Sequence, residues 1–84
     1  MSNYKVGTVS HYYDKIGVAV VNLSGDLATG DKVLFTRGGE DLFEQTISSI
    51  QSEHKKIESA HKGETIGLKV DSELKEGAEV YKIQ

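Results

Sequence analysis

Short segments rich in β-branched residues alternate with glycine-containing turns along the whole chain, and this pattern limits the fold more than any other feature. Eight Val, six Ile and five Thr are spread over 84 residues, together with nine Gly. Branched side chains favour the pleated surface of a sheet, and turns this frequent leave no room for long helices. A chain of this length forms one domain. We therefore expect residues 1–84 to be a single all-β domain.

The expected strands follow from the apolar residues between the turns. They cover residues 4–13, 16–23, 32–37, 42–53, 55–60, 65–70 and 78–83. The alternation is clearest in 65–70, where Ile66, Leu68 and Val70 would point inward and the residues between them outward. In a strand over 4–13, one face would carry Tyr4, Val6, Thr8, Ser10 and Tyr12.

Residues 42–53 allow two interpretations. The spacing of Phe43, Ile47 and Ile50 fits one face of a helix, whereas in a strand the apolar side changes after Ile47. A β-bulge produces such a change, and the β-branched and hydroxyl residues of the TISSI segment favour the strand. Because closing a sheet removes its exposed edges, we expect a small closed antiparallel β-barrel of about six to seven strands.

The residue types that support catalysis or metal binding are absent or poorly arranged. The chain has no Cys, which excludes disulfides, thiolate metal sites and cysteine nucleophiles. His11, His54 and His61 lack the spacing of a zinc site. Paired carboxylates occur only at Glu40–Asp41 and within 71–79, where they are typical of solvated charge, and no glycine string matches a phosphate-binding loop. We expect no cofactor and no metal, and we expect that the chain is not an enzyme.

Composition also bears on location and assembly. No apolar run approaches the roughly 20 residues that a membrane span needs, and the N-terminus lacks a basic-then-apolar leader. The expectation is a cytoplasmic protein with no membrane contact. The balanced charge and modest apolar content fit a monomer.

The net charge of −3 is concentrated in residues 71–79, which by themselves carry −3. The only mildly basic stretch is residues 54–70, with a net charge of +2. The lack of a strongly basic face disfavours DNA and non-specific nucleic-acid binding, although it leaves a local RNA contact open. The basic candidates for a partner-binding site are His54, Lys55, Lys56 and Lys62.

Aromatic side chains supply a second group of candidates. His11, Tyr12 and Tyr13 directly precede an expected hairpin turn at Asp14–Lys15. Exposed rings stack on nucleic-acid bases or anchor a protein partner. The alternative, which we favour, is that one tyrosine packs inward while the other shields the rim of the barrel.

Two motifs carry a resemblance to a known family. They are Gly25-x-Leu27-x-x-Gly30-Asp31-x-Val33 and Ala60-x-x-Gly63-Glu64-x-Ile66-Gly67-Leu68. With them, nearly the whole chain resembles the second, β-barrel domain of translational GTPases such as elongation factor Tu and initiation factor two. A similar barrel ends some collagenase-like peptidases. The resemblance implies a closed β-barrel in which Gly30 and Gly63 allow tight turns.

The resemblance suggests that the chain has a function but no enzymatic activity of its own. The sequence contains no GTPase domain, so no GTP hydrolysis is carried over. We expect a non-catalytic binding module that contacts RNA, a ribonucleoprotein or a translation-related protein partner. The alternative is an accessory subunit of a peptidase-like or RNA-modifying enzyme.

Overall fold

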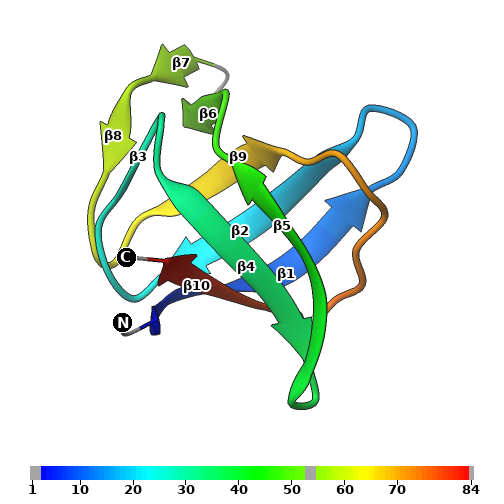
Figure 1. Cartoon of the computed structure of the whole chain (residues 1–84). Helices are drawn as coiled ribbons and strands as arrows, with labels where there is room; N and C mark the ends of the chain where they lie inside the picture. Colours follow the sequence, from blue (N-terminus) through cyan, green and yellow to red (C-terminus); the bar gives the residue numbers. More distant parts are fainter. Residues whose placement is uncertain (1–2, 53–54, 84) are drawn as a thin grey trace.

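The computed structural model of the protein describes residues 3–52 and 55–83, and these residues form ten strands and no helix (Figure 1). The strands are β1 (Asn3–Tyr13), β2 (Val18–Leu23), β3 (Leu27–Ala28), β4 (Lys32–Arg37), β5 (Glu40–Thr46), β6 (Ile50–Ser52), β7 (Lys55–Ile57), β8 (Ser59–Ala60), β9 (Thr65–Lys69) and β10 (Glu79–Ile83). The all-β prediction is confirmed.

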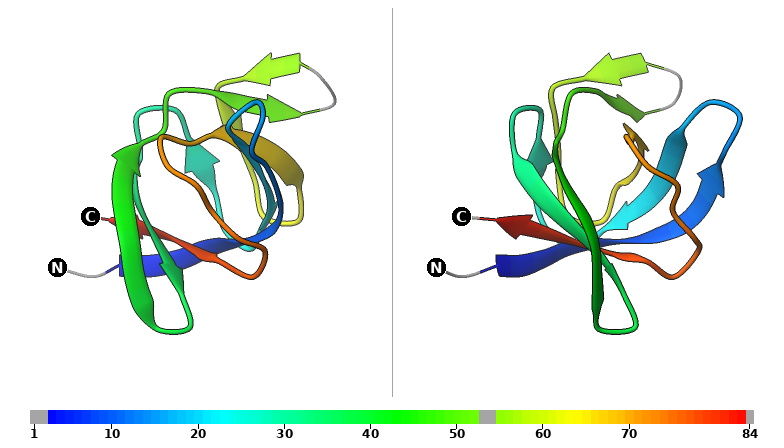
Figure 2. Two further views of the ribbon diagram at one scale, coloured as in Figure 1. Left: turned by 90° about the vertical axis from the view of Figure 1, so that its right-hand side faces the viewer. Right: turned by 45° about the vertical axis from the view of Figure 1, so that its right-hand side comes forward.

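Eight of these strands form one antiparallel sheet in the order β5-β4-β10-β1-β2-β9-β6-β7, and β3 pairs with β8 in a second, small sheet. Figure 2 shows that the large sheet is rolled around an interior. The first and last strands are neighbours, since Asn3 of β1 pairs with Ile83 of β10. The two ends of the described chain therefore lie side by side, as Figure 1 also shows.

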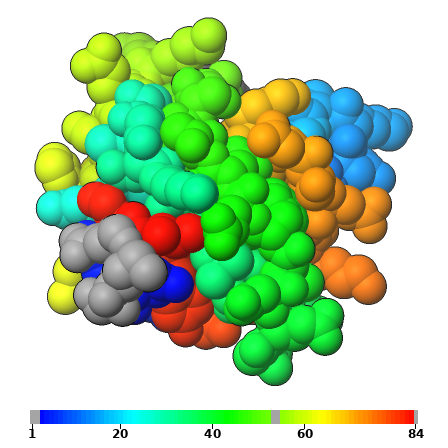
Figure 3. All heavy atoms as spheres, viewed as in Figure 1, coloured from blue at the N-terminus to red at the C-terminus, as the bar shows by residue number. Residues whose placement is uncertain are grey.

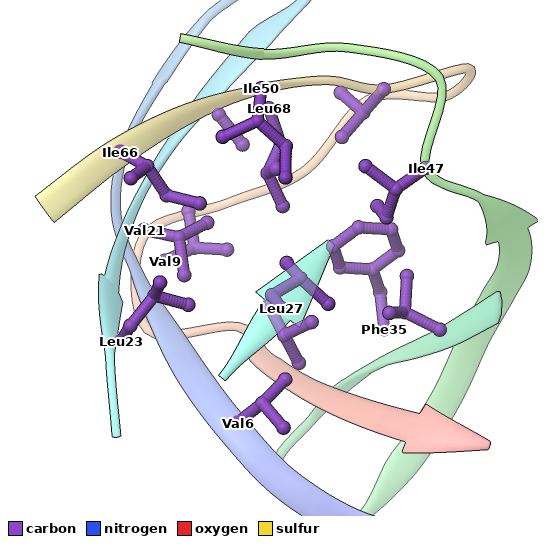
Figure 4. Packing of buried hydrophobic residues seen from close by; sticks show 14 of the residues in the cluster. Val6, Val9, Val21, Leu23, Leu27, Phe35, Ile47, Ile50, Ile66 and Leu68 are labelled. Atoms are coloured by element: carbon purple, nitrogen blue, oxygen red, sulfur yellow. The ribbon is translucent and has the colours of Figure 1, made fainter. Parts of the chain in front are cut away.

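The interior is filled by aliphatic side chains and one phenylalanine (Figure 4). Phe35 is fully buried, and its ring lies 4.9 Å from that of the partly buried Phe43 on the neighbouring strand. Ile66, Leu68 and Val70 all point inward, as the alternation of residues 65–70 predicts. Each Å² of apolar surface removed from water stabilises the fold by about 25 cal/mol. This cluster is therefore the main source of stability.

The closed barrel is not confirmed, because the ladder of backbone hydrogen bonds has two ends, β5 and β7. A buried side chain spans the gap beside β5. Gln45 Nε2 donates to the carbonyl of Lys69 at 2.9 Å, and the Asp71 N–H donates to Gln45 Oε1 at 2.8 Å. The seam next to β5 is thus joined by one amide side chain, and we call this contact the Gln45 bridge.

Other expected boundaries change in the structure. Residues 42–53 are not one bulged strand, because the chain leaves the sheet at 47–49 and Ile47 instead bonds to the β3–β4 turn. In β1, register shifts near Val6 and Ser10 break the simple alternation, so that Val6 and Val9 are both buried. The strand expected from residue 16 begins at Val18.

The tight turns expected at two glycines are present. Gly30 and Gly63 both have a φ of 93°, a conformation that side chains with a Cβ rarely adopt. Gly30 ends the turn between β3 and β4, and Gly63 lies between β8 and β9.

Candidate functional site

The aromatic candidates lie at the end of β1, where the β1–β2 hairpin turns. Tyr12 is partly buried against the core, whereas Tyr13 is 49% exposed. The rings of His11 and Tyr13 meet edge-on with centroids 4.3 Å apart, and His11 Nδ1 lies 3.0 Å from Glu76 Oε2. Tyr13 and the neighbouring Ile16, which is 58% exposed, leave apolar surface at this tip.

One basic candidate shares an outer face with the aromatic group. Strand pairing aligns Lys56 of β7, Gln51 of β6, Gly67 of β9, Val20 of β2 and His11 of β1 in one row across the sheet. Directly paired residues point to the same side of a sheet, and five strands about 4.8 Å apart place the ends of this row about 19 Å from each other. The structure therefore joins Lys56 and His11 on one face, without bringing them into contact.

The other basic candidates are placed apart from this row. Lys55 pairs with Ser52 at the far end of the β6–β7 hairpin. Lys62 lies in the turn before β9, where its N–H faces the Asp26 carboxylate at 3.4 Å. That turn lies near Leu23, at the end of β2 opposite the hairpin that carries Tyr13. At about 3.4 Å per residue, the length of β2 separates the two ends by about 17 Å. His54 lies outside the described residues.

A hollow of about 400 Å³ lies where the end of β7 meets residues 48–50 and Thr29. Its lining consists of three hydroxyl side chains, two isoleucines and one pair of opposite charges: Thr29, Ser48, Ser49, Ile50, Ile57, Lys56 and Glu58. Only Lys56 of this group was a candidate from the sequence. The hollow forms where the chain leaves the sheet between β5 and β6, which the pattern of residues 42–53 did not predict.

A second hollow, of about 260 Å³, lies on the outer face of β4 and β10. It is lined by Asn3, Leu34, Thr36, Gly39, Asp41, Glu79 and Tyr81. None of the candidates from the sequence lines this hollow, because the Glu40–Asp41 pair in a glycine turn is typical of solvated charge. The missing signal was the pairing of β4 with β5 and β10, which no local pattern reveals.

Electrostatic contacts tie the sheet together near its ends. Lys82 Nζ of β10 lies 3.1 Å from Asp31 Oδ2, and the same oxygen accepts a hydrogen bond from the Ala28 N–H at 2.9 Å. The hydrogen bond to Asp31 raises the pKa of the Lys82 ammonium above its ordinary 10.5, and partial burial opposes this effect. Asp31 thus links the β3–β4 turn to the last strand.

Within residues 3–52 and 55–83, no group of three or more His, Cys, Asp or Glu side chains is arranged to hold a metal ion. The same residues include no helix with the length and apolar character that a membrane crossing requires. The two hollows described above present hydroxyls, charged side chains and apolar walls.

Comparison with known sequences finds peptidases. No protein-family model matches the chain. It is 36% identical over 77 residues to an uncharacterized protease of Methanocaldococcus jannaschii, and 28% identical over 78 residues to a collagenase of Porphyromonas gingivalis. Each match covers 92% of this chain. The chain spans only about a fifth of these relatives, 19% of the protease and 22% of the collagenase.

Comparison with solved structures identifies the corresponding domain. The C-terminal domain of a putative U32 peptidase from Geobacillus thermoleovorans superposes with a TM-score of 0.88 and 25% identity, over 96% of this chain and 93% of that one. Its selenomethionine variant gives a TM-score of 0.83 and 26% identity, over 90% and 95% of the two chains. The class defined by fold and sequence is thus a small all-β domain found in peptidases. In particular, the chain is homologous to the C-terminal domain of a putative U32 peptidase and to a segment of a collagenase.

These findings correct two expectations. The resemblance to the second domain of translational GTPases is not shown, whereas the similarity to collagenase-like peptidases is. The expectation that the chain is not an enzyme is contradicted, because its relatives are named as a protease, a collagenase and a putative U32 peptidase. The catalytic groups of this chain alone are not informative here, because the chain matches only about a fifth of larger proteins.

Proposed function

We propose that this chain acts with a U32-type peptidase unit as its polypeptide-binding module. The observation that carries the proposal is the match over almost the whole chain to a domain that ends a putative U32 peptidase. Two hollows on its surface are lined by hydroxyls, charged side chains and apolar groups, which suit contacts with an extended polypeptide. In this role the module holds a macromolecular substrate near the peptidase unit and raises its local concentration.

The surface that we assign to the peptidase unit is the tip of the β1–β2 hairpin. Tyr13 and Ile16 are large apolar side chains, and they are 49% and 58% exposed. Neighbouring exposed apolar side chains are typical of protein contacts, and tyrosine is enriched at the centre of such contacts. His11 and Lys56 continue the same outer face and would contribute polar contacts around this apolar centre.

A domain exchange in the Porphyromonas gingivalis collagenase tests the proposal. Four proteins are compared for hydrolysis of fluorescent gelatin and of a short peptide: the whole collagenase, a version without its matching segment, a version with this chain in that place, and this chain alone. We expect the shortened collagenase to lose activity mainly on gelatin, and we expect this chain to restore it. Gelatin hydrolysis by the chain alone would instead place catalysis within the module.

Variants of the exchanged module test the assigned surface. Tyr13→Ser combined with Ile16→Ser should prevent the restoration, because it removes the apolar contact. Leu42→Ser is the matched control, since Leu42 is also exposed, at 40%, but lies on edge strand β5. Equal activity of the shortened and exchanged proteins would refute the proposed function. Copurification with RNA rather than a peptidase would favour the RNA-modifying alternative.

A further inference from the structure

The hollow on the outer face of β4 and β10 contains two carboxylates with a hydroxyl between them. Strand pairing places Glu79 of β10 opposite Thr36 of β4, and Thr36 opposite Asp41 of β5. Paired residues on one face have Cβ atoms about 5 Å apart. The row therefore spans three strands in the order carboxylate, hydroxyl, carboxylate. In Figure 3 the surface of β10, in red, lies beside that of the β4–β5 hairpin, in green.

A bulge in β5 creates this row. Phe35 pairs with Phe43, but the next residue of β4, Thr36, pairs with Asp41 instead of Leu42. Without the extra residue, Leu42 would lie opposite Thr36 and Asp41 would point to the other face, because side chains alternate along a strand. Bulges commonly redirect a side chain next to a functional site.

The central hydroxyl has no partner within the described part of the chain. Thr36 is only 6% exposed, and its side chain forms no hydrogen bond with any residue that the structure describes. Gln45, the other buried polar residue, is 7% exposed and uses both of its polar atoms in the Gln45 bridge. Among the described residues no buried side-chain oxygen or nitrogen lacks a hydrogen-bond partner, so the Thr36 hydroxyl oxygen is not sealed off but still reaches the surface. Since Thr36 lines the hollow, its hydroxyl is available to a ligand there.

The charges of the hollow favour a cation. Asp41 forms no ion pair with another described residue, and Glu79 is paired with Lys5 at 3.0 Å. No cationic side chain lines the hollow itself. Next to the charged row, Tyr81 pairs with Leu34 and supplies an apolar wall. A long cationic side chain would rest its alkyl stem on this wall and place its charged group at the carboxylates.

We propose that this hollow binds the guanidinium group of an arginine side chain in a polypeptide. The planar guanidinium has five donors in a fixed fork, and these match acceptors spread along a row better than the compact ammonium of lysine does. Asp41 accepts two of its hydrogen bonds, Thr36 accepts one, and Tyr81 packs against the stem. The inference rests on the proposed polypeptide-binding role and names the side chain that the module recognises.

The test is an NMR titration of the full chain, labelled with ¹⁵N, with the capped tripeptide acetyl-Gly-Arg-Gly-amide. Peptides with citrulline or lysine in place of arginine are the comparisons, because citrulline has the same shape without the charge. We expect the arginine peptide to shift the amide signals of residues 34–41 and 79–81, with roughly tenfold weaker binding of either comparison peptide.

Substitutions within the row separate its contributions. Asp41→Asn should weaken binding of the arginine peptide roughly tenfold or more, because it removes a charged acceptor, and Thr36→Val should weaken it several-fold. Asp14→Asn is the control, since Asp14 has the same charge but lies in the β1–β2 turn. A dispersed spectrum shows that each variant is folded, and Asp41→Asn alone suffices if Thr36→Val is unfolded.

The inference is overturned if the arginine peptide causes no shifts at these residues at millimolar concentration. It is also overturned if citrulline or lysine peptides bind equally well, or if Asp41→Asn binds like the Asp14→Asn control. These results are independent of the collagenase exchange. A chain that restores gelatin hydrolysis without binding the arginine peptide would refute this inference alone, and arginine binding without restoration would refute the proposed function alone.

Discussion

The Gln45 bridge offers a direct test of how the rolled sheet is held together at its open edge. Replacing Gln45 with alanine removes two hydrogen bonds, of 2.9 and 2.8 Å, that join β5 to the chain after β9. It leaves the Lys69 carbonyl and the Asp71 N–H without these partners. Each unsatisfied, partly buried group costs about 1–3 kcal/mol. Some access to water reduces the sum, and we expect Gln45→Ala to lower the free energy of unfolding by about 2–4 kcal/mol.

The measurement is urea unfolding followed by circular dichroism, with thermal unfolding as a second readout. For a domain of this size, 1 kcal/mol corresponds to about 4–8 °C in Tm, so the expected loss is roughly 8–32 °C. Gln51→Ala is the matched control, because Gln51 is an exposed glutamine on β6. Its effect should stay within about 0.5 kcal/mol.

A third variant separates the two hydrogen bonds of the bridge. Gln45→Glu keeps an acceptor for the Asp71 N–H, but at neutral pH its carboxylate faces the Lys69 carbonyl without a proton to donate. We expect Gln45→Glu to be less destabilised, relative to the unaltered chain, at pH 4 than at pH 7, because the protonated acid donates again. If Gln45→Ala and Gln51→Ala had equal stability, the bridge would not hold the edge and the reasoning would be refuted.

Three further predictions concern other parts of the sheet. Gly7→Ala should cost about 1–3 kcal/mol, measured by urea unfolding, because an added Cβ would lie 2.5 Å from Val21 Cγ1. Phe35→Ala should cost about 3–5 kcal/mol in the same assay, since the ring is fully buried. Lys82→Met should make unfolding less dependent on pH above about 10.5: the raised pKa of Lys82 stabilises the fold below that pH, and this contribution is lost as pH rises through the folded-state pKa.

Controls for these predictions use neighbouring positions. Val21→Ala makes room for a Cβ at residue 7, so the double variant should lose less stability than the sum of the single variants. Lys75→Met changes an exposed lysine, and it should leave the pH dependence of the free energy of unfolding above about pH 10.5 unchanged. Identical alkaline profiles for Lys82→Met and the unaltered chain would contradict the role given to Asp31, and a stable Phe35→Ala variant would contradict the role given to the core.

Much of the fold can be predicted from local patterns, whereas the sites cannot. The run from Thr65 to Val70 alternates so regularly that its inward side is evident, because one face of a half-buried strand must be apolar. The break between β5 and β6 is different. Ile47 leaves the sheet to bond with the β3–β4 turn, a contact between residues that are distant in sequence. No pattern within 42–53 distinguishes such a break from a bulge.

The sequence by itself determined that this chain is all-β and where its tight turns lie. Those features follow from backbone conformation and from apolar alternation, which act between near neighbours. Only the tertiary structure decided that Gln45 joins the open edge and that Thr36 lies between Glu79 and Asp41. The physical reason is register: a bulge of one residue in β5 selects Asp41 over Leu42, and that choice depends on the packing of Phe43 against Phe35 across the strands.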